Sequence, residues 1–212
     1  MTYRKCISLL ALSISLCVAL VPAIAPAAPI VFQHAGSGSG TLNGVPFFNS
    51  PFVITAFGDT SQVVYAYPGN PAVSVWYIDH TSAQIQIGGV GTYSFFTPTR
   101  TFVNNKVDPP EPGIVGFSRA GNGGLDLFNG PQDALFDTWT ATTSIGPVTG
   151  NGHLGQWNNS PVITTGGVLE FNANEIVPTT FIATVIPEPT AATIGLGLLA
   201  PLTLVRRRRQ AA

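Results

Sequence analysis

The stretch Ala83-Gln84-Ile85-Gln86-Ile87 alternates apolar and polar side chains with a period of two. This pattern is typical of a β-strand that buries one face and exposes the other. Gly167-Val168-Leu169-Glu170-Phe171 repeats the pattern near the other end of the chain. Further short runs rich in β-branched and aromatic residues lie at 30–32, 52–57, 62–67, 73–78, 91–97, 101–103, 114–118, 125–128 and 180–185. The sequence therefore predicts β-strands along most of its length.

Glycine and proline separate these runs. Short strands divided by turn residues at intervals of roughly 8–12 residues are typical of an all-β sandwich. We expect an all-β fold, a jelly-roll-like or immunoglobulin-like β-sandwich, over residues 28–186. Asn43-Gly44 predicts a type I′ hairpin turn, and 131–139 is expected to form a strand or a single turn. The glycine-rich run at 36–40 lacks the Lys-Ser/Thr end of a phosphate loop, so we expect a flexible lead into the hairpin.

Charge is distributed unevenly along the chain. The segment 28–189 holds three basic residues, Arg100, Lys106 and Arg119, against all ten acidic ones, which gives a formal charge of −7. Nucleic-acid binding needs clustered cations to neutralise phosphates, so this segment argues against it. The two cysteines, Cys6 and Cys17, both precede the segment. Disulfides, cysteine metal sites and cysteine nucleophiles are therefore not expected in the body.

The first 27 residues have the pattern of a secretory signal peptide. Arg4-Lys5 precede an apolar run at 7–21, and small residues follow. The small-x-small sequence Ala25-Pro26-Ala27 predicts cleavage by signal peptidase before Ala28, after export through the Sec translocon. The alternative is an uncleaved anchor helix, but the apolar run is short for a span and prolines break its end.

The last residues predict a membrane helix at 190–205. This segment carries no charge, and Arg206, Arg207, Arg208 and Arg209 follow it directly. As a helix, sixteen residues reach about 24 Å, which is shorter than the roughly 30 Å hydrocarbon core, so the anchor is marginal. Basic residues stay on the cytoplasmic side of a membrane. Because both ends are basic, we expect the body between them to lie outside the cell.

Pro187-Glu188-Pro189, the apolar segment and the arginine cluster together resemble the PEP-CTERM sorting signal of Gram-negative bacteria. The resemblance covers 187–212. It implies recognition and processing at Pro187, Glu188 and Pro189 by an exosortase, a membrane transpeptidase-like enzyme. It also implies an inner-membrane intermediate, a final place on the cell surface or in the extracellular matrix, and an association with exopolysaccharide. The alternative is an ordinary tail anchor after a chance Pro-Glu-Pro.

Residues that carry chemistry are few. Asp126, Asp133 and Asp137 lie near a glycine-rich loop at 121–124, and loop carboxylates can bind a structural calcium ion. Solvated loop acids are the alternative, and no other cofactor is predicted. We expect the three histidines to be solvent-exposed or turn residues, since no G-x-S-x-G elbow or H-E-x-x-H pair accompanies them. No catalytic residue is predicted.

Three classes of function remain. We expect a non-enzymatic surface or matrix protein associated with exopolysaccharide. A second hypothesis is a carbohydrate-binding module with an aromatic platform, although the same aromatics suit a core. The candidates for that platform are Trp76, Trp139, Trp157, Tyr65, Tyr67 and Tyr77. A third is a secreted hydrolase, for which Glu170 and Glu175 form the only candidate acid pair.

Overall fold

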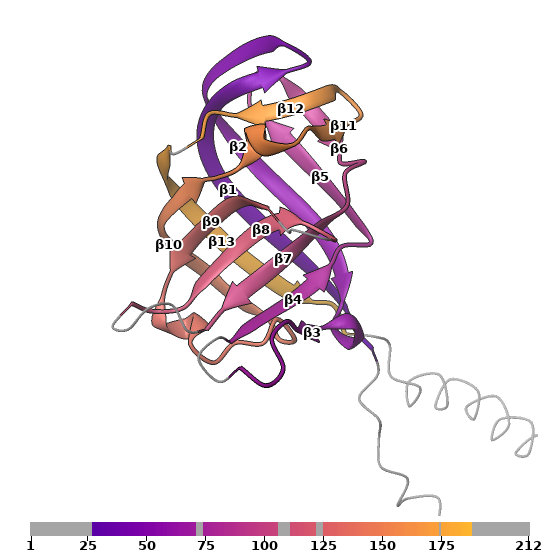
Figure 1. The fold of residues 1–212 in the computed structure, drawn as a ribbon, viewed down its shortest axis with the longest axis vertical. Helices are drawn as coiled ribbons and strands as arrows, with labels where there is room; N and C mark the ends of the chain where they lie inside the picture. Colours follow the sequence, from indigo (N-terminus) through magenta and orange to yellow (C-terminus); the bar gives the residue numbers. More distant parts are fainter. Residues whose placement is uncertain (1–26, 71–73, 106–110, 122–124, 174, 188–212) are drawn as a thin grey trace, which may run out of the picture.

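The computed structural model describes residues 27–70, 74–105, 111–121, 125–173 and 175–187 (Figure 1). Most of the predicted signal peptide, Ala25 included, lies outside these residues, as do Glu188, Pro189, the predicted membrane helix at 190–205 and the four terminal arginines. Within the described residues the helices are three short 3₁₀ turns, η1 (Thr60–Gln62), η2 (Ala134–Phe136) and η3 (Trp157–Asn159). None of the helices described is long and apolar enough to span a membrane.

The rest of the described chain is dominated by antiparallel strands, so the prediction of an all-β fold is confirmed. The strands are β1 (Pro29–Leu42), β2 (Val45–Asp59), β3 (Val64–Tyr65), β4 (Val75–Asp79), β5 (Ser82–Ile87), β6 (Gly91–Ser94), β7 (Thr99–Asn104), β8 (Ile114–Arg119), β9 (Asp126–Gln132), β10 (Ile145–Leu154), β11 (Val162–Thr164), β12 (Gly167–Phe171) and β13 (Ile176–Val185). The segment predicted as a strand or a single turn at 131–139 holds the end of β9 and the turn η2.

Two long strands, β1 and β2, form the central hairpin. Leu42 pairs with Val45 across a two-residue turn, and its residues Asn43 and Gly44 have φ angles of 49° and 79°. Two consecutive positive φ angles are those of a type I′ turn, whose twist matches that of the flanking strands. The predicted turn is confirmed.

The glycine-rich run at 36–40 is part of β1, so the expected flexible lead is wrong. Its glycines lie on the inner face of the strand, where other elements come close. A Cβ atom on Gly38 would lie 2.6 Å from Cδ1 of Leu154, and one on Gly40 would lie 2.0 Å from the backbone oxygen of Glu170. Glycine is required here for close packing of strands and core side chains.

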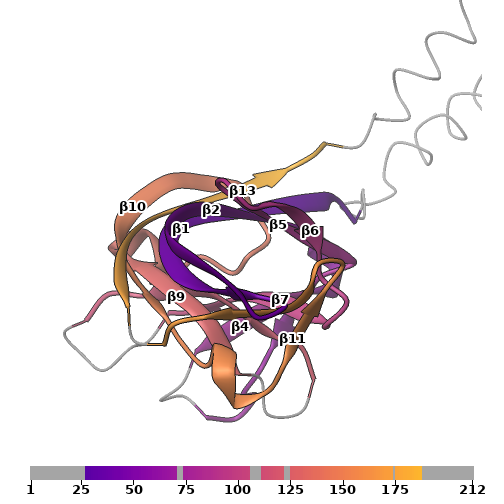
Figure 2. The ribbon, with the colours of Figure 1, turned by 90° about the horizontal axis from the view of Figure 1, so that it is seen from above.

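All the strands belong to one sheet, which folds back on itself. The main order is β3-β4-β7-β8-β9-β10-β13-β1-β2-β5-β6. The far half of β1 pairs with β12, β12 pairs with β11, and a bridge from Phe95 to Thr164 links β11 with the residues after β6. These pairings close a ring of strands at one end. Figure 2 shows the sheet curling so that β1, β2 and β5 lie opposite β4 and β7.

The inner faces of the folded sheet meet in an aromatic core. Phe52 of β2 contacts Phe128 of β9 with ring centroids 5.4 Å apart, and Trp157 and Trp139 are also buried. Along β4 the side chains of Trp76 and Ile78 turn inward and those of Val75 and Tyr77 turn outward, as the period-two pattern predicts. The alternation in sequence therefore decides which aromatics fill the core.

The two ends of the described chain lie side by side. Ile30 pairs with Val185, and the amide of Ile186 donates to the backbone oxygen of Pro29 at 2.8 Å. The first and last strands thus enter and leave the sheet at one point, at the lower edge of the molecule in Figure 1.

Candidate functional site

The outer face of β4, β7, β8 and β9 carries a cluster of aromatic and polar side chains. The register places Tyr77 opposite Phe102, and Arg100 opposite Ser118. Ser118 is in turn opposite Asp126. Side chains that pair across neighbouring strands share one face of a sheet, so four strands bring these groups together although they are far apart in sequence.

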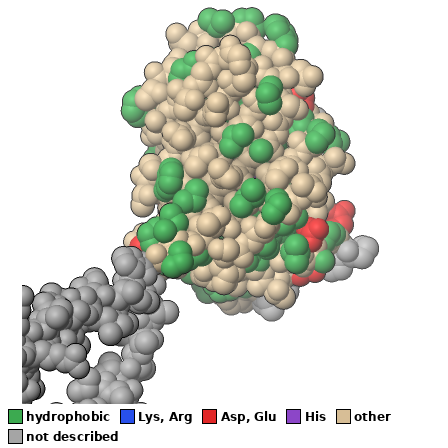
Figure 3. Space-filling view, turned by 180° about the vertical axis from the view of Figure 1, so that it is seen from behind, with side chains coloured by type: hydrophobic (Ala, Val, Ile, Leu, Met, Phe, Trp, Pro, Cys, Tyr) green, Lys and Arg blue, Asp and Glu red, His purple; other side chains and the backbone are tan. Residues whose placement is uncertain are grey.

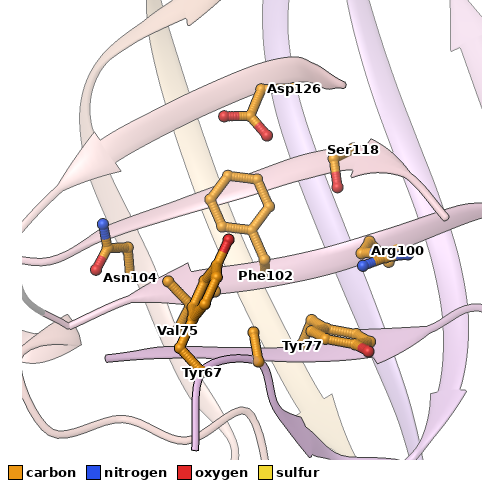
Figure 4. A pocket seen from close by; sticks show the side chains of 9 residues that line it. Tyr67, Val75, Tyr77, Arg100, Phe102, Asn104, Ser118 and Asp126 are labelled. Carbon is orange, nitrogen blue, oxygen red and sulfur yellow. The ribbon is translucent and has the colours of Figure 1, made fainter. Parts of the chain in front are cut away.

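These residues line a groove of about 340 Å³, which we call the Phe102 groove. Tyr67, half exposed after β3, stands at one side of it (Figure 4). The groove is lined by Ala66, Tyr67, Val75, Tyr77, Arg100, Phe102, Asn104, Ser118 and Asp126.

The floor of the groove is the ring of Phe102. A Cβ atom on Gly116 would lie 2.4 Å from Cζ of Phe102, so the ring lies against the bare backbone of β8. Any larger residue at position 116 would displace it. Figure 4 shows the ring lying along the sheet, with Asp126, Ser118 and Arg100 on one side and Asn104 and Tyr67 on the other.

The guanidinium of Arg100 is held by three groups. Its Cζ atom lies 4.3 Å from the centroid of the Tyr77 ring, its Nε lies 3.2 Å from Oδ1 of Asp79, and its Nη2 donates to the backbone oxygen of Gly121 at 3.4 Å. Cation–π stacking and an ion pair both favour this position. Arg100 is therefore paired with Asp79, although the Asp79 side chain is 57% exposed and the pair is in contact with solvent.

Asp126 is the other charged group that lines the groove. Nδ2 of Asn129 donates to its Oδ2 at 3.1 Å. Burial raises the pKa of the Asp126 carboxyl above its ordinary value, and the hydrogen bond from Asn129 opposes that rise. In the view of Figure 4 the carboxylate lies near the Phe102 ring. It can accept hydrogen bonds from hydroxyl groups of a ligand seated there.

This arrangement suits an amphipathic polyhydroxylated ligand. An exposed aromatic face attracts apolar C–H groups, and a few convergent polar groups fix orientation. The described lining residues contain one carboxylate, on Asp126, three hydroxyls, on Ser118, Tyr67 and Tyr77, and no histidine.

The aromatic platform considered as an alternative does not form from the tryptophans, which take the core positions that the same residues also suit. Trp139 and Trp157 are buried, and Trp76 packs on the core with the Tyr65 ring tilted against it at 4.7 Å between ring centroids. Of the predicted aromatics, Tyr67 and Tyr77 reach the groove. Phe102, Arg100, Asn104 and Ser118 were missed by sequence reasoning. The alternation within 99–104 was the available signal, since it separates buried Thr99, Thr101 and Val103 from their outward neighbours.

The three candidate calcium ligands have separate local roles. Asp126 lies in the groove, while Oδ1 of Asp133 caps η2 by accepting from the amide of Leu135 at 2.8 Å. Oδ1 of Asp137 accepts from the amide of Gly113 at 2.7 Å. Among the described residues, no group of three or more His, Cys, Asp or Glu side chains lies close enough to hold a metal ion. The glycine-rich loop beside them is described only in part.

His34 lies inside the sheet, so the expectation that the histidines are exposed or in turns is wrong for this residue, whereas His80 lies in the two-residue connection between β4 and β5. His34 is fully buried on the inner face of β1, and His80, between β4 and β5, is half buried. Oγ1 of Thr101 lies 3.1 Å from Nε2 of His34 and 3.0 Å from Nε2 of His80, and Thr99 Oγ1 lies 2.9 Å from His80 Nδ1. Phe117, Phe128 and Phe181 surround His34. This cluster belongs to the core.

The remaining predicted residues do not meet the groove. Glu175 accepts from the amide of Ser39 and from Asn172, both at 3.2 Å, and Glu170 lines a small hollow on β12 instead. Pro187 is exposed beyond β13, and the rest of the sorting signal lies outside the described residues.

On the opposite face of the molecule, the outward positions of the described strands carry no charge except Asp59 at the end of β2. Outward positions of β13, β1, β2 and β5 hold threonine, glutamine, serine and scattered apolar side chains. Figure 3 shows no basic side chain on this face, and its acidic ones lie at the margins. Scattered single apolar residues are normal on a surface, so the Phe102 groove is the better candidate site.

The chain matches no protein-family model, and comparison with curated proteins and with solved structures finds no similar protein.

Proposed function

We propose that this chain is an exported, non-enzymatic surface or matrix protein, sorted by an exosortase and bound to extracellular polysaccharide through the Phe102 groove. Carbohydrate binding, first considered as an alternative, becomes the activity of the matrix protein's body. The observation that carries the proposal is the flat Phe102 ring surrounded by Asp126, Ser118, Arg100 and Asn104 on the outer face of the sheet.

Two features of the fold support the delivery part of the proposal. β1 begins at Pro29, one residue after the predicted signal-peptidase cut, and β13 ends at Val185, before Pro187-Glu188-Pro189. Removal of both terminal segments would leave every strand of the sheet intact. The ends are also neighbours, which suits a body held outside a membrane by two basic-ended segments on the same side.

As part of this proposal we classify the body as a jelly-roll-like or immunoglobulin-like β-sandwich. Its support is the packing of β1 and β2 against β7 and β9, which includes the hydrogen bond between His34 and Thr101.

Sorting is tested by replacing Pro187, Glu188 and Pro189 with alanine in a host that contains an exosortase, with a tag in the body. We expect the wild-type protein to lose its C-terminal segment and leave the inner membrane, and the triple variant to stay there at full size. A control with Ile186→Ala, next to the motif, should be processed normally. Equal size and location of the wild type and the triple variant would contradict the sorting claim.

Binding is tested with the full-length protein on immobilised glucans, mannans and galactans. Phe102→Ala removes the floor of the groove and should lower retention about tenfold, since one aromatic stacking contact contributes on the order of 1–2 kcal/mol. Phe57→Ala, which removes a partly exposed ring from β2 on the opposite face, is the matched control and should be retained like the wild type. Equal loss in both variants would argue for a general effect on folding.

A further inference from the structure

We infer that the Phe102 groove takes uncharged hexose units and discriminates against uronate or sulfated ones. The inference rests on the proposed polysaccharide function and names its ligand class.

The charges of the groove carry this inference. Arg100 is the one cation among the described lining residues, and Asp79 together with Tyr77 already engages it. Its side chain is only 15% exposed, and moving it toward a ligand anion would break the ion pair with Asp79. The groove therefore offers a ligand carboxylate or sulfate only a largely buried guanidinium that is already stacked on Tyr77 and paired with Asp79.

Asp126 adds a negative charge that is not matched by a cation in the structure described. It accepts one hydrogen bond, from the neutral amide of Asn129, and lines the groove beside Ser118. Hydroxyl groups of a neutral sugar can donate to this carboxylate, whereas a uronate would place a second carboxylate near it. The excess of acidic residues over the whole body also repels an anionic ligand, and salt screens this long-range repulsion.

The geometry fits a hexopyranose ring. Phe102 offers a face for the C–H groups of one side of the sugar, and Tyr67 stands beside it. Asp126 and Ser118 lie along one edge of that face and Asn104 along another. A ligand seated on the ring thus meets the Asp126 carboxylate as an acceptor at its rim, while Ser118 is buried beside it and Arg100 is engaged by Asp79 and Tyr77.

The experiment compares each neutral polysaccharide with its own derivative in which the C6 hydroxyl is oxidised to a carboxylate. Binding of the full-length protein to glucan, mannan and galactan pairs is measured at about 150 mM salt, where the Debye length is about 8 Å. We expect the neutral member to bind about tenfold more tightly than the oxidised one. Asp126→Asn should reduce that ratio several-fold. Glu170→Gln removes the same charge outside the groove and should leave the ratio unchanged.

Equal or tighter binding of the oxidised polymers would overturn the inference while leaving polysaccharide binding in place. An equal fall of the ratio in Asp126→Asn and Glu170→Gln would also overturn it, because the discrimination would then come from net charge. If the folded wild-type protein retains neither form of any polymer, the polysaccharide part of the proposed function fails together with the inference.

Discussion

Three side chains, His34, Thr101 and His80, form a continuous polar chain inside an aromatic core. The Thr101 hydroxyl has one proton, so it donates to one Nε2 and accepts from the other. Nδ1 of His34 has no hydrogen-bond partner among the described residues. An unpaired lone pair is tolerated better than an unpaired buried N–H. We therefore assign the ring proton of neutral His34 to Nε2, which donates to Oγ1 of Thr101. The Thr101 hydroxyl then donates to Nε2 of His80, and Nδ1 of His80 donates to Oγ1 of Thr99.

Both histidines should make the protein sensitive to mild acid. Burial lowers the pKa of His34 to about 3, and burial, with smaller effects of His34 and Arg100, lowers that of His80 to about 3. The unfolded chain, with histidine pKa near 6.5, binds protons that the folded protein does not bind between pH 6.5 and 3. The free energy of unfolding should therefore decrease as the pH is lowered through this window, by about 4 kcal/mol from pH 7 to pH 5. Urea unfolding at both pH values measures this change.

The matched variant is His34→Leu, which removes one titrating group and keeps a similar volume. The absolute stability of this variant does not matter for the test. Its free energy of unfolding should change between pH 7 and pH 5 by about half as much as that of the wild type. A wild-type protein equally stable at both pH values would contradict the neutral state of the two histidines in the folded protein.

At the scale of elements, the β1–β2 hairpin depends on its turn. Gly44 has a φ angle of 79°, and a Cβ atom placed on it would meet nothing within 4 Å. Any cost of a side chain at this position therefore comes from backbone conformation alone.

Gly44→Ala should lower the free energy of unfolding by about 1 kcal/mol, because alanine disfavours the left-handed region. Asparagine visits that region more readily, so Gly44→Asn should cost less. Chemical denaturation of the two variants measures the difference. Identical losses would mean that the turn does not have the I′ geometry.

The calcium hypothesis concerns acidic side chains in two neighbouring elements, β9 and the turn η2. Asp133 and Asp137 each accept a hydrogen bond from a backbone N–H, whereas Asp126 accepts one from the side chain of Asn129. We expect the same melting midpoint with and without a chelator. A midpoint that falls by several degrees in chelator would instead support a structural calcium site.

Individual elements were well predicted because their signals are local. The alternation at 83–87 and 167–171 reports one buried and one exposed face, and Asn43-Gly44 determines its turn through backbone sterics. The prediction of a flexible lead at the glycine-rich run 36–40 was wrong for a physical reason. In a loop they would signal flexibility, but here they lie where Leu154 and β12 approach β1, and such contacts depend on distant residues.

At the scale of the whole molecule, the groove results from strand order. Tyr77, Phe102, Ser118 and Asp126 lie on four strands, and the register that places them side by side is not encoded in any one segment. The period-two alternation separates Tyr77 from Trp76 and Ile78, but it could not predict which residues would lie beside Tyr77. Burial of His34 was missed for the same reason, since its partner Thr101 lies 67 residues away.

The proposed sorting segments and the proposed binding groove lie at different places on the fold. Both ends of the described chain meet at the β1–β13 pair, and the groove lies on the face formed by β4, β7, β8 and β9. A substitution in the groove should therefore leave export and processing unchanged.

Retention in extracellular polysaccharide tests the whole account most directly. In a host that exports and processes the protein, the fractions of wild-type, Phe102→Ala and Phe57→Ala bodies in the polysaccharide and in the free medium are measured after equal secretion is verified. The account predicts that wild type and Phe57→Ala remain with the polysaccharide, while Phe102→Ala is processed to the same size but appears mainly in the medium. Equal retention of the wild type and Phe102→Ala would contradict it.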